Sequence, residues 1–254
     1  MTWTKYKKSL LKMYRRLRCA VLGGQRILVL ADSHAGVFEY AFDHNLLAPH
    51  LLNCEIVGGA TAGGLNNDHS VTAAFAKFQT ALRRFATYDV VVIMLGEVDC
   101  SFALWHRAQQ RGETAFQQIP RAMQGIERLL DWGMQQHAQC HFVLAGGILP
   151  TIRDDQIDQQ EHELRRSVRA TQRERSDLVR AFNQALADLA ARRGLPYIDI
   201  TAQTIDPERG VLRDEFLVQD MVDHHQSQAM TAALWVEELK PVLAAIARRR
   251  RARD

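Results

Sequence analysis

The chain has 254 residues, of which 47% are hydrophobic and 24% are charged, and its formal net charge is +3. This length and composition suit one α/β domain with a sizeable core, and the small net charge argues against a nucleic-acid-binding protein. Because basic residues gather at both ends, we expect the domain to cover 25–247, between a basic segment, 1–24, and a basic tail, 248–254.

The first segment has the pattern of a basic amphipathic helix. Lysines and arginines stand between large apolar residues that recur at spacings of three and four: Trp3, Tyr6, Leu10, Tyr14 and Leu17. The run 19–24 is too short and too interrupted by glycine to be a signal-peptide core or a membrane span, so we expect a cytoplasmic protein. We favour packing of the helix on the domain through its apolar side. The alternative is peripheral contact with an anionic inner membrane.

Beyond residue 25, short apolar runs alternate with longer amphipathic ones. The apolar runs predict strands at 26–31, 55–58, 89–95, 141–145 and 197–200. Helical spacing covers 37–47, 71–86, 115–137, 161–193 and 227–248. This alternation predicts a parallel sheet with helices on both faces. The run 89–95 is apolar at consecutive positions, which predicts a central strand.

The first predicted strand runs directly into Asp32-Ser33-His34. A serine at this point lies just past the carboxyl end of a strand, where open α/β sheets bind their ligands. Near the other end of the sequence, Asp223-His224-His225 precedes the last predicted helix. Together the two segments supply the hydroxyl, imidazole and carboxylate that acyl transfer requires.

The other predicted strands end in loops rich in glycine and polar residues. These loops are 58–64 after the second strand, Gly96-Glu97-Val98-Asp99 after the third and 146–150 after the fourth. Right-handed crossovers bring such loops to one rim of the sheet. Glycine there allows backbone N–H groups to approach a ligand, so the rim is the expected site of chemistry.

The order of these segments resembles that of the SGNH, or GDSL-type, hydrolases. ADSHAG stands in the place of the first block of the family, with Ser33 as nucleophile, VGGATAGG in that of the second, GEVD in that of the third and DMVDHH in that of the fifth. The resemblance implies a three-layer α/β/α sandwich with a five-stranded parallel, flavodoxin-like sheet. It also implies that a glycine amide helps to form the oxyanion hole, Gly59 being the first choice and Gly63 the second.

The third block departs from the family pattern. Val98 replaces the asparagine that donates to the oxyanion, unless Asn66, Asn67 or His34 takes over that role. Loss of one such donor costs on the order of 3 kcal/mol of transition-state stabilisation. The site is therefore expected to be an atypical one.

The late block departs as well, because the strict DxxH spacing is absent. The base is either His225 with Asp223 as its carboxylate, or His224 with Asp220. We prefer His225 because the next two residues, Gln226-Ser227, resemble those after the family histidine.

Several phrases, VGGATAGGLNN, LGEVDCSFALWHRA and VDHHQ, also resemble an SGNH-like branch associated with bacterial capsule and surface-polysaccharide genes. The resemblance implies an O-acetyl esterase or O-acetyltransferase acting on a small-molecule or glycan substrate. No cofactor is expected, apart from an acyl donor such as acetyl-CoA if the protein is a transferase.

Two other functions stay open. Asp32, His34, Glu97, Asp99 and the late histidines are also ligands that a metal-dependent phosphoesterase would use, although the motif order suits the serine hydrolase better. The third interpretation is a glycan-binding protein that keeps the fold and has lost its oxyanion hole. The sequence indicates no particular oligomeric state.

Overall fold

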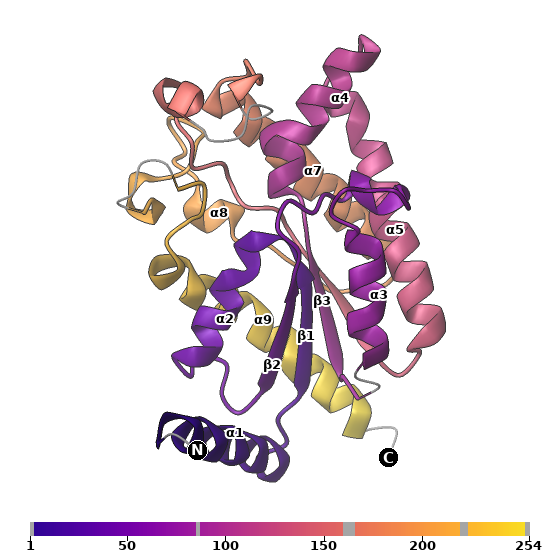
Figure 1. The fold of residues 1–254 in the computed structure, drawn as a ribbon, viewed down its shortest axis with the longest axis vertical. Helices are drawn as coiled ribbons and strands as arrows, with labels where there is room; N and C mark the ends of the chain where they lie inside the picture. Colours follow the sequence, from indigo (N-terminus) through magenta and orange to yellow (C-terminus); the bar gives the residue numbers. More distant parts are fainter. Residues whose placement is uncertain (1–2, 85–86, 160–165, 219–222, 252–254) are drawn as a thin grey trace.

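The computed structural model describes residues 3–84, 87–159, 166–218 and 223–251. At its centre is a five-stranded parallel sheet with the strand order β2-β1-β3-β4-β5 (Figure 1). The strands are β1 (Arg26–Ala31), β2 (Leu51–Ile56), β3 (Val90–Met94), β4 (His141–Ala145) and β5 (Tyr197–Ile198). This is the flavodoxin-like order, in which ligands bind beyond the carboxyl ends of the strands.

Helices cover both faces of the sheet, which confirms the predicted three-layer sandwich (Figure 1). One face is covered by α3 (Ala74–Arg84), α5 (Ile119–Gln136) and α7 (Gln172–Arg192), and the other by α2 (Gly36–Asp43) and α9 (Gln228–Arg251). The remaining described α-helices are α1 (Trp3–Val21), α4 (Leu104–Arg111) and α8 (Thr201–Thr204).

The strand β3 lies between β1 and β4 and is buried along its whole length. Val91 and Ile93 pack into the core beneath α3, α5 and α7, and Val92 packs into the core beneath α2 and α9. Successive side chains of a strand point to opposite faces, so a strand buried on both faces must be apolar throughout. The apolar run 89–95 therefore identified the central strand correctly.

The second strand begins earlier in the sequence than predicted. It begins at Leu51, paired with Arg26 of β1, whereas the expected range was 55–58. β2 is an edge strand, and Asn53 in its middle is exposed. An edge strand tolerates polar side chains, and here Asn53 interrupts the apolar signal of Leu51 and Leu52 on which a prediction relies.

The helix predicted over 161–193 begins later than expected. Residues 160–165 lie outside the described part of the chain, and α7 starts at Gln172. The Thr171 hydroxyl accepts a hydrogen bond from the Glu174 amide, and the Glu174 carboxylate accepts one from the Thr171 amide. This reciprocal capping box fixes the start of the helix.

The helix α1 does not pack on the domain through its apolar side, which was the favoured prediction. Leu10, Tyr14 and Leu17 are exposed, whereas Cys19 is buried. Within the described residues, no helix is long and apolar enough to cross a bilayer.

Gly125 of α5 allows that helix to touch the loop after β2, and this contact yields a prediction. A Cβ atom at Gly125 would lie 1.9 Å from the Ala62 carbonyl oxygen. We expect Gly125→Ala to lower the free energy of unfolding by about 1–3 kcal/mol in urea denaturation, because overpacking outweighs the gain in helix propensity. Gly58→Ala is the control, since its Cβ would meet nothing within 4 Å. Equal stability of the two variants would contradict the close contact.

Candidate active site

Ser33 lies at the junction between β1 and α2. The buried strand ends at Ala31, and a single 3-10 turn over Ser33–Ala35 leads into α2. The Asp32 carboxylate caps this turn by accepting a hydrogen bond from the His34 amide at 3.0 Å. The cap holds the half-buried Ser33 at the carboxyl end of the sheet, as the sequence predicted.

The structure brings Ser33 together with His225 and Asp223. Nε2 of His225 lies 2.9 Å from Oγ of Ser33, and Nδ1 of His225 lies 2.6 Å from Oδ1 of Asp223. With the Nδ1 proton donated to the carboxylate, Nε2 is left to accept the proton of the serine hydroxyl. The three groups form one hydrogen-bond chain with the geometry of a nucleophile, base and orienting acid.

Asp223 is suited to remain ionised in this chain. Partial burial raises the pKa of its carboxyl, but hydrogen bonds from the amide and ring of His225 outweigh this effect, and the net pKa lies below the usual value. A carboxylate in this position keeps the imidazole in one tautomer and stabilises its protonated form.

The segment that carries Asp223 and His225 is held against the domain by hydrogen bonds. The buried Gln226 side chain donates to the Leu149 carbonyl at 3.1 Å, and its backbone bridges to Leu217. The Ser227 amide donates to the Phe216 carbonyl at 2.8 Å, and α9 begins at the next residue. The position of His225 therefore depends on contacts with two other parts of the chain.

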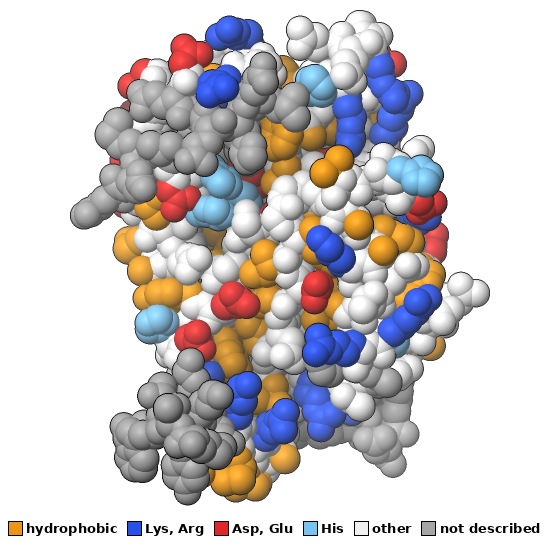
Figure 2. Space-filling model, viewed as in Figure 1, with side chains coloured by type: hydrophobic (Ala, Val, Ile, Leu, Met, Phe, Trp, Pro, Cys, Tyr) orange, Lys and Arg blue, Asp and Glu red, His pale blue; other side chains and the backbone are white. Residues whose placement is uncertain are grey.

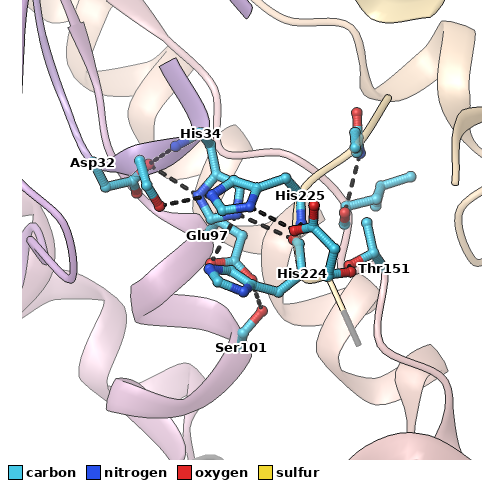
Figure 3. Close-up of polar contacts among 11 residues, drawn as sticks. Asp32, His34, Glu97, Ser101, Thr151, His224 and His225 are labelled. Atoms are coloured by element: carbon cyan, nitrogen blue, oxygen red, sulfur yellow. Dashed lines mark hydrogen bonds and ion pairs between the residues drawn. The ribbon is translucent and has the colours of Figure 1, made fainter. Parts of the chain in front are cut away.

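His34 lies in a second polar cluster beside the first. Figure 3 shows its ring between Asp32, Glu97 and the backbone of His224. Nδ1 lies 3.0 Å from the Asp32 carboxylate, and Nε2 lies 3.4 Å from the Glu97 carboxylate and 3.2 Å from the His224 carbonyl oxygen. Ser101 donates a hydrogen bond to Glu97.

Burial would lower the pKa of His34, but the charges of Glu97 and Asp32 outweigh burial and raise the pKa to about 9. All three side chains are almost fully buried, so the ion pairs are poorly screened. His34 is therefore a buried imidazolium at neutral pH, and its contact with the His224 carbonyl supports the segment that carries His225.

His34 and His225 are each oriented by the same kind of local turn. In Asp32-Ser33-His34 and in Asp223-His224-His225, one aspartate oxygen accepts from the backbone amide and lies within hydrogen-bond distance of Nδ1 of the histidine two residues later. Both turns leave Nε2 facing away from the aspartate. The Nε2 atoms differ in their partners, because one faces Ser33 and the other faces Glu97 and a carbonyl group.

The loop after β2 is fastened by Asp99, which corrects one predicted role. The buried Asp99 carboxylate accepts hydrogen bonds from the Ala62 amide at 2.6 Å and from the Gly63 amide at 3.1 Å. Because its N–H is directed to Asp99, Gly63 is not an oxyanion donor here. Within the described residues, the Gly59 amide donates to no protein group, and Gly59 has a left-handed φ of 71°.

Burial raises the pKa of Asp99 to about 6, although the hydrogen bonds from Ala62 and Gly63 oppose this rise. At neutral pH the group is therefore an ionised acceptor for the loop. Val98 beside it is 2% exposed and packs as an apolar residue. Asn66 donates to the Arg121 carbonyl and Asn67 accepts from the His69 amide, so neither is directed to Ser33 by these contacts.

The alternative acid and base pair, Asp220 with His224, lies partly outside the described residues, because Asp220 is not among them. The ring of His224 packs against the ring of His225 with centroids 4.2 Å apart, and the hydroxyl of Ser33 lies within hydrogen-bond distance of Nε2 of His225.

Three histidines are the described residues that best fit a transition metal. Ligand atoms of His34, His224 and His225 all lie within 4.8 Å of one another. Nitrogen ligands of this kind suit zinc. However, Nε2 of His225 already contacts Ser33, and both ring nitrogens of His34 face protein acceptors, so a metal would have to displace these contacts.

One buried polar residue at the rim was missed by the sequence analysis. Asn183 of α7 accepts from the Gly147 amide and donates to the Gly147 carbonyl, both at 2.8 Å. It thereby fixes the loop after β4. The available signal was an asparagine on the apolar face of a helix, between Val179 and Leu186.

No protein-family model and no curated protein sequence matches the chain. Solved structures share its fold at low sequence identity. A protein of Bacteroides fragilis assigned as an acylhydrolase has a TM-score of 0.57 at 12% identity, with 88% of each chain covered. A GDSL-like lipase from Bacteroides thetaiotaomicron has a TM-score of 0.53 at 14% identity, covering 92% of this chain and 97% of that one. An acetyl xylan esterase has a TM-score of 0.50 at 13% identity, covering 85% and 98%.

These neighbours show that the chain has the fold of SGNH/GDSL-like hydrolases. The fold expected from the order of the sequence blocks is therefore confirmed.

His34 makes the stability of the protein depend on pH. Its pKa of about 9 in the folded state exceeds the ordinary value of 6.5, so the native state binds the extra proton between these values. The stabilisation is complete below about pH 6.5 and is lost as the pH rises through 9, with a total on the order of 3 kcal/mol. We expect the free energy of unfolding in urea to fall more steeply over this range for the unsubstituted protein than for His34→Gln. Parallel curves would contradict a charged His34.

Proposed function

We propose that the protein is a serine-dependent ester hydrolase or O-acyltransferase in which Ser33 is the nucleophile. The observation that carries this proposal is the continuous hydrogen-bond chain from Asp223 through His225 to Ser33. It stands at the carboxyl end of β1, where folds of this class place their chemistry. Fold alone does not establish activity, so the proposal depends on the side-chain geometry.

In the first half of the reaction, Nε2 of His225 removes the proton of Ser33 while Oγ attacks the carbonyl carbon of the ester. The tetrahedral intermediate then collapses, and the leaving alkoxide takes the proton from His225. The product is an acyl group bound to Ser33 and a free alcohol. Asp223 stabilises the imidazolium at each transfer without taking its proton.

In the second half, an acceptor hydroxyl attacks the acyl-serine and gives its proton to His225. The second tetrahedral intermediate collapses by breaking the bond between the acyl carbon and Oγ of Ser33, which takes the proton back from His225. Water as acceptor makes the enzyme a hydrolase, and a sugar hydroxyl makes it a transferase. The oxyanion is stabilised by the amides of Ser33 and Gly59 in this proposal, because the amides of Ala62 and Gly63 are directed to Asp99. The buried Val98 contributes no side-chain donor, which is consistent with an atypical acyl-transfer site.

Substitution of the serine tests this function. We expect Ser33→Ala to lower the hydrolysis of p-nitrophenyl acetate by at least about 10³-fold and to abolish covalent labelling by a fluorophosphonate, because no nucleophile remains. Asp223→Asn should lose most of the activity and keep the fold. Thr80→Ala, which removes an exposed hydroxyl on α3, is the control.

Two outcomes would overturn the assignment. Labelling that persists in Ser33→Ala would place the nucleophile elsewhere. Activity that survives Ser33→Ala and disappears after dialysis against a chelator would instead favour the metal-dependent phosphoesterase, for which the cluster of His34, His224 and His225 is the supporting observation.

The acyl group in this proposal is a small one, carried by a carbohydrate. A small pocket beside His225 is also lined by Ile148 and Trp235 and leaves little room next to the base. The resemblance to a branch associated with surface polysaccharides supports a glycan substrate. The acetyl xylan esterase that shares the fold offers a precedent for acetylated sugars.

The size of this pocket predicts a preference for short acyl chains. We expect kcat/KM to fall at least about tenfold from p-nitrophenyl acetate to p-nitrophenyl octanoate, because a long chain would overpack the pocket beside His225. An acetylated oligosaccharide should release acetate in the same assay. A preference for octanoate would contradict the acetyl assignment while leaving the role of Ser33 intact.

A further inference from the structure

In the described part of α1, a polar side of the helix faces the domain. Arg15 forms an ion pair with Asp43 at 3.5 Å, and Arg18 donates to the Asn45 side chain at 2.5 Å. Cys19, on the same side of the helix, is buried. These contacts fix the rotation of α1 about its own axis.

The opposite side of the helix is apolar and exposed. We call it the outer face of α1, formed by Leu10, Met13, Tyr14, Leu17 and Val21. Spacings of three and four align these residues along one side of a helix. Leu17 is 64% exposed and Val21 is 72% exposed. Such a continuous exposed apolar stripe marks an interaction surface.

Positive charge lies near the outer face. Arg16, three residues after Met13, is exposed at its border. The exposed Arg248 and Arg249 near the end of α9 lie at the same end of the molecule, because the neighbouring Arg250 contacts Asp89 and Asp89 accepts from the first amide of β1. Figure 2 shows hydrophobic side chains at the lower end of the molecule beside lysine and arginine side chains.

The partner must therefore offer an apolar layer and negative charge together. A second copy of the chain would place basic residues against basic residues. An anionic bilayer offers acyl chains beneath acidic headgroups, and amphipathic helices with basic borders bind such surfaces in the interface plane.

We propose that α1 docks the protein on the surface of an anionic lipid bilayer, with the outer face of α1 inserted at the boundary between headgroups and acyl chains. Ser33 lies at the carboxyl end of β1, whereas α1 joins its amino end. The six residues of β1 separate the two by roughly 20 Å. Docking therefore leaves Ser33 turned away from the membrane, and it does not depend on the proposed esterase activity.

Vesicle binding of the full chain tests this proposal. We expect the protein to sediment with phosphatidylglycerol vesicles and to bind phosphatidylcholine vesicles at least tenfold more weakly. The double variant Leu17→Glu with Val21→Glu should lose at least tenfold in binding, and added salt should weaken the binding of the unsubstituted chain. Val71→Glu is the matched control, because Val71 is fully exposed in another part of the surface.

Three results would overturn the proposal. The first is failure of the unsubstituted chain to bind phosphatidylglycerol vesicles, and the second is equal binding by the double variant. The third is a dimer in light scattering that the double variant dissociates, which would make the outer face of α1 an interface between copies. Circular dichroism checks that both variants keep the helical content of the unsubstituted chain.

Discussion

A buried imidazolium holds together three segments of this chain that are far apart in sequence. His34 follows β1, Glu97 follows β3, and the His224 carbonyl belongs to the segment before α9. Removing charges from water is unfavourable unless they are paired and hydrogen-bonded, and this cluster supplies both kinds of contact. Loss of one partner would leave buried charge uncompensated, so the three segments are constrained to one arrangement. The neighbouring pair of Ser33 and His225 lies within that arrangement.

The same principle governs the rest of the rim. The loop after β2 has two amides directed to Asp99, and the loop after β4 has its Gly147 amide and carbonyl paired with Asn183. Irregular backbone that is buried must find hydrogen-bond partners, and here side chains from other elements provide them. The consequence for chemistry is preorganisation, since the groups around Ser33 need little rearrangement when charge develops.

Features that depend on a local sequence pattern were predictable from the sequence, whereas features that depend on contacts between residues far apart in the sequence were not. β1 and β4 have the predicted bounds because their apolar runs end abruptly, and Ser33, Asp223 and His225 stood out through short motifs in a family-like order. The hydrogen bond from the Gly63 amide to the Asp99 carboxylate depends on a contact between two loops, which no local pattern contains. The outer face of α1 gives a similar lesson. Periodicity identifies which residues share a side of a helix, but tertiary contacts such as those of Arg15 decide which side the domain covers.

The repeated Asp-x-His turn has a consequence for protein engineering. Three consecutive residues are enough to orient an imidazole, because the aspartate contacts both the backbone amide and the ring of the same histidine. Such a turn fixes Nδ1 within three residues, whereas contacts with other parts of the chain determine which group Nε2 meets. A reactive histidine differs from a structural one in this molecule by the group that its Nε2 atom contacts. A designer who wanted a second reactive centre on this scaffold would change the environment beyond Nε2 of His34 and leave its turn untouched.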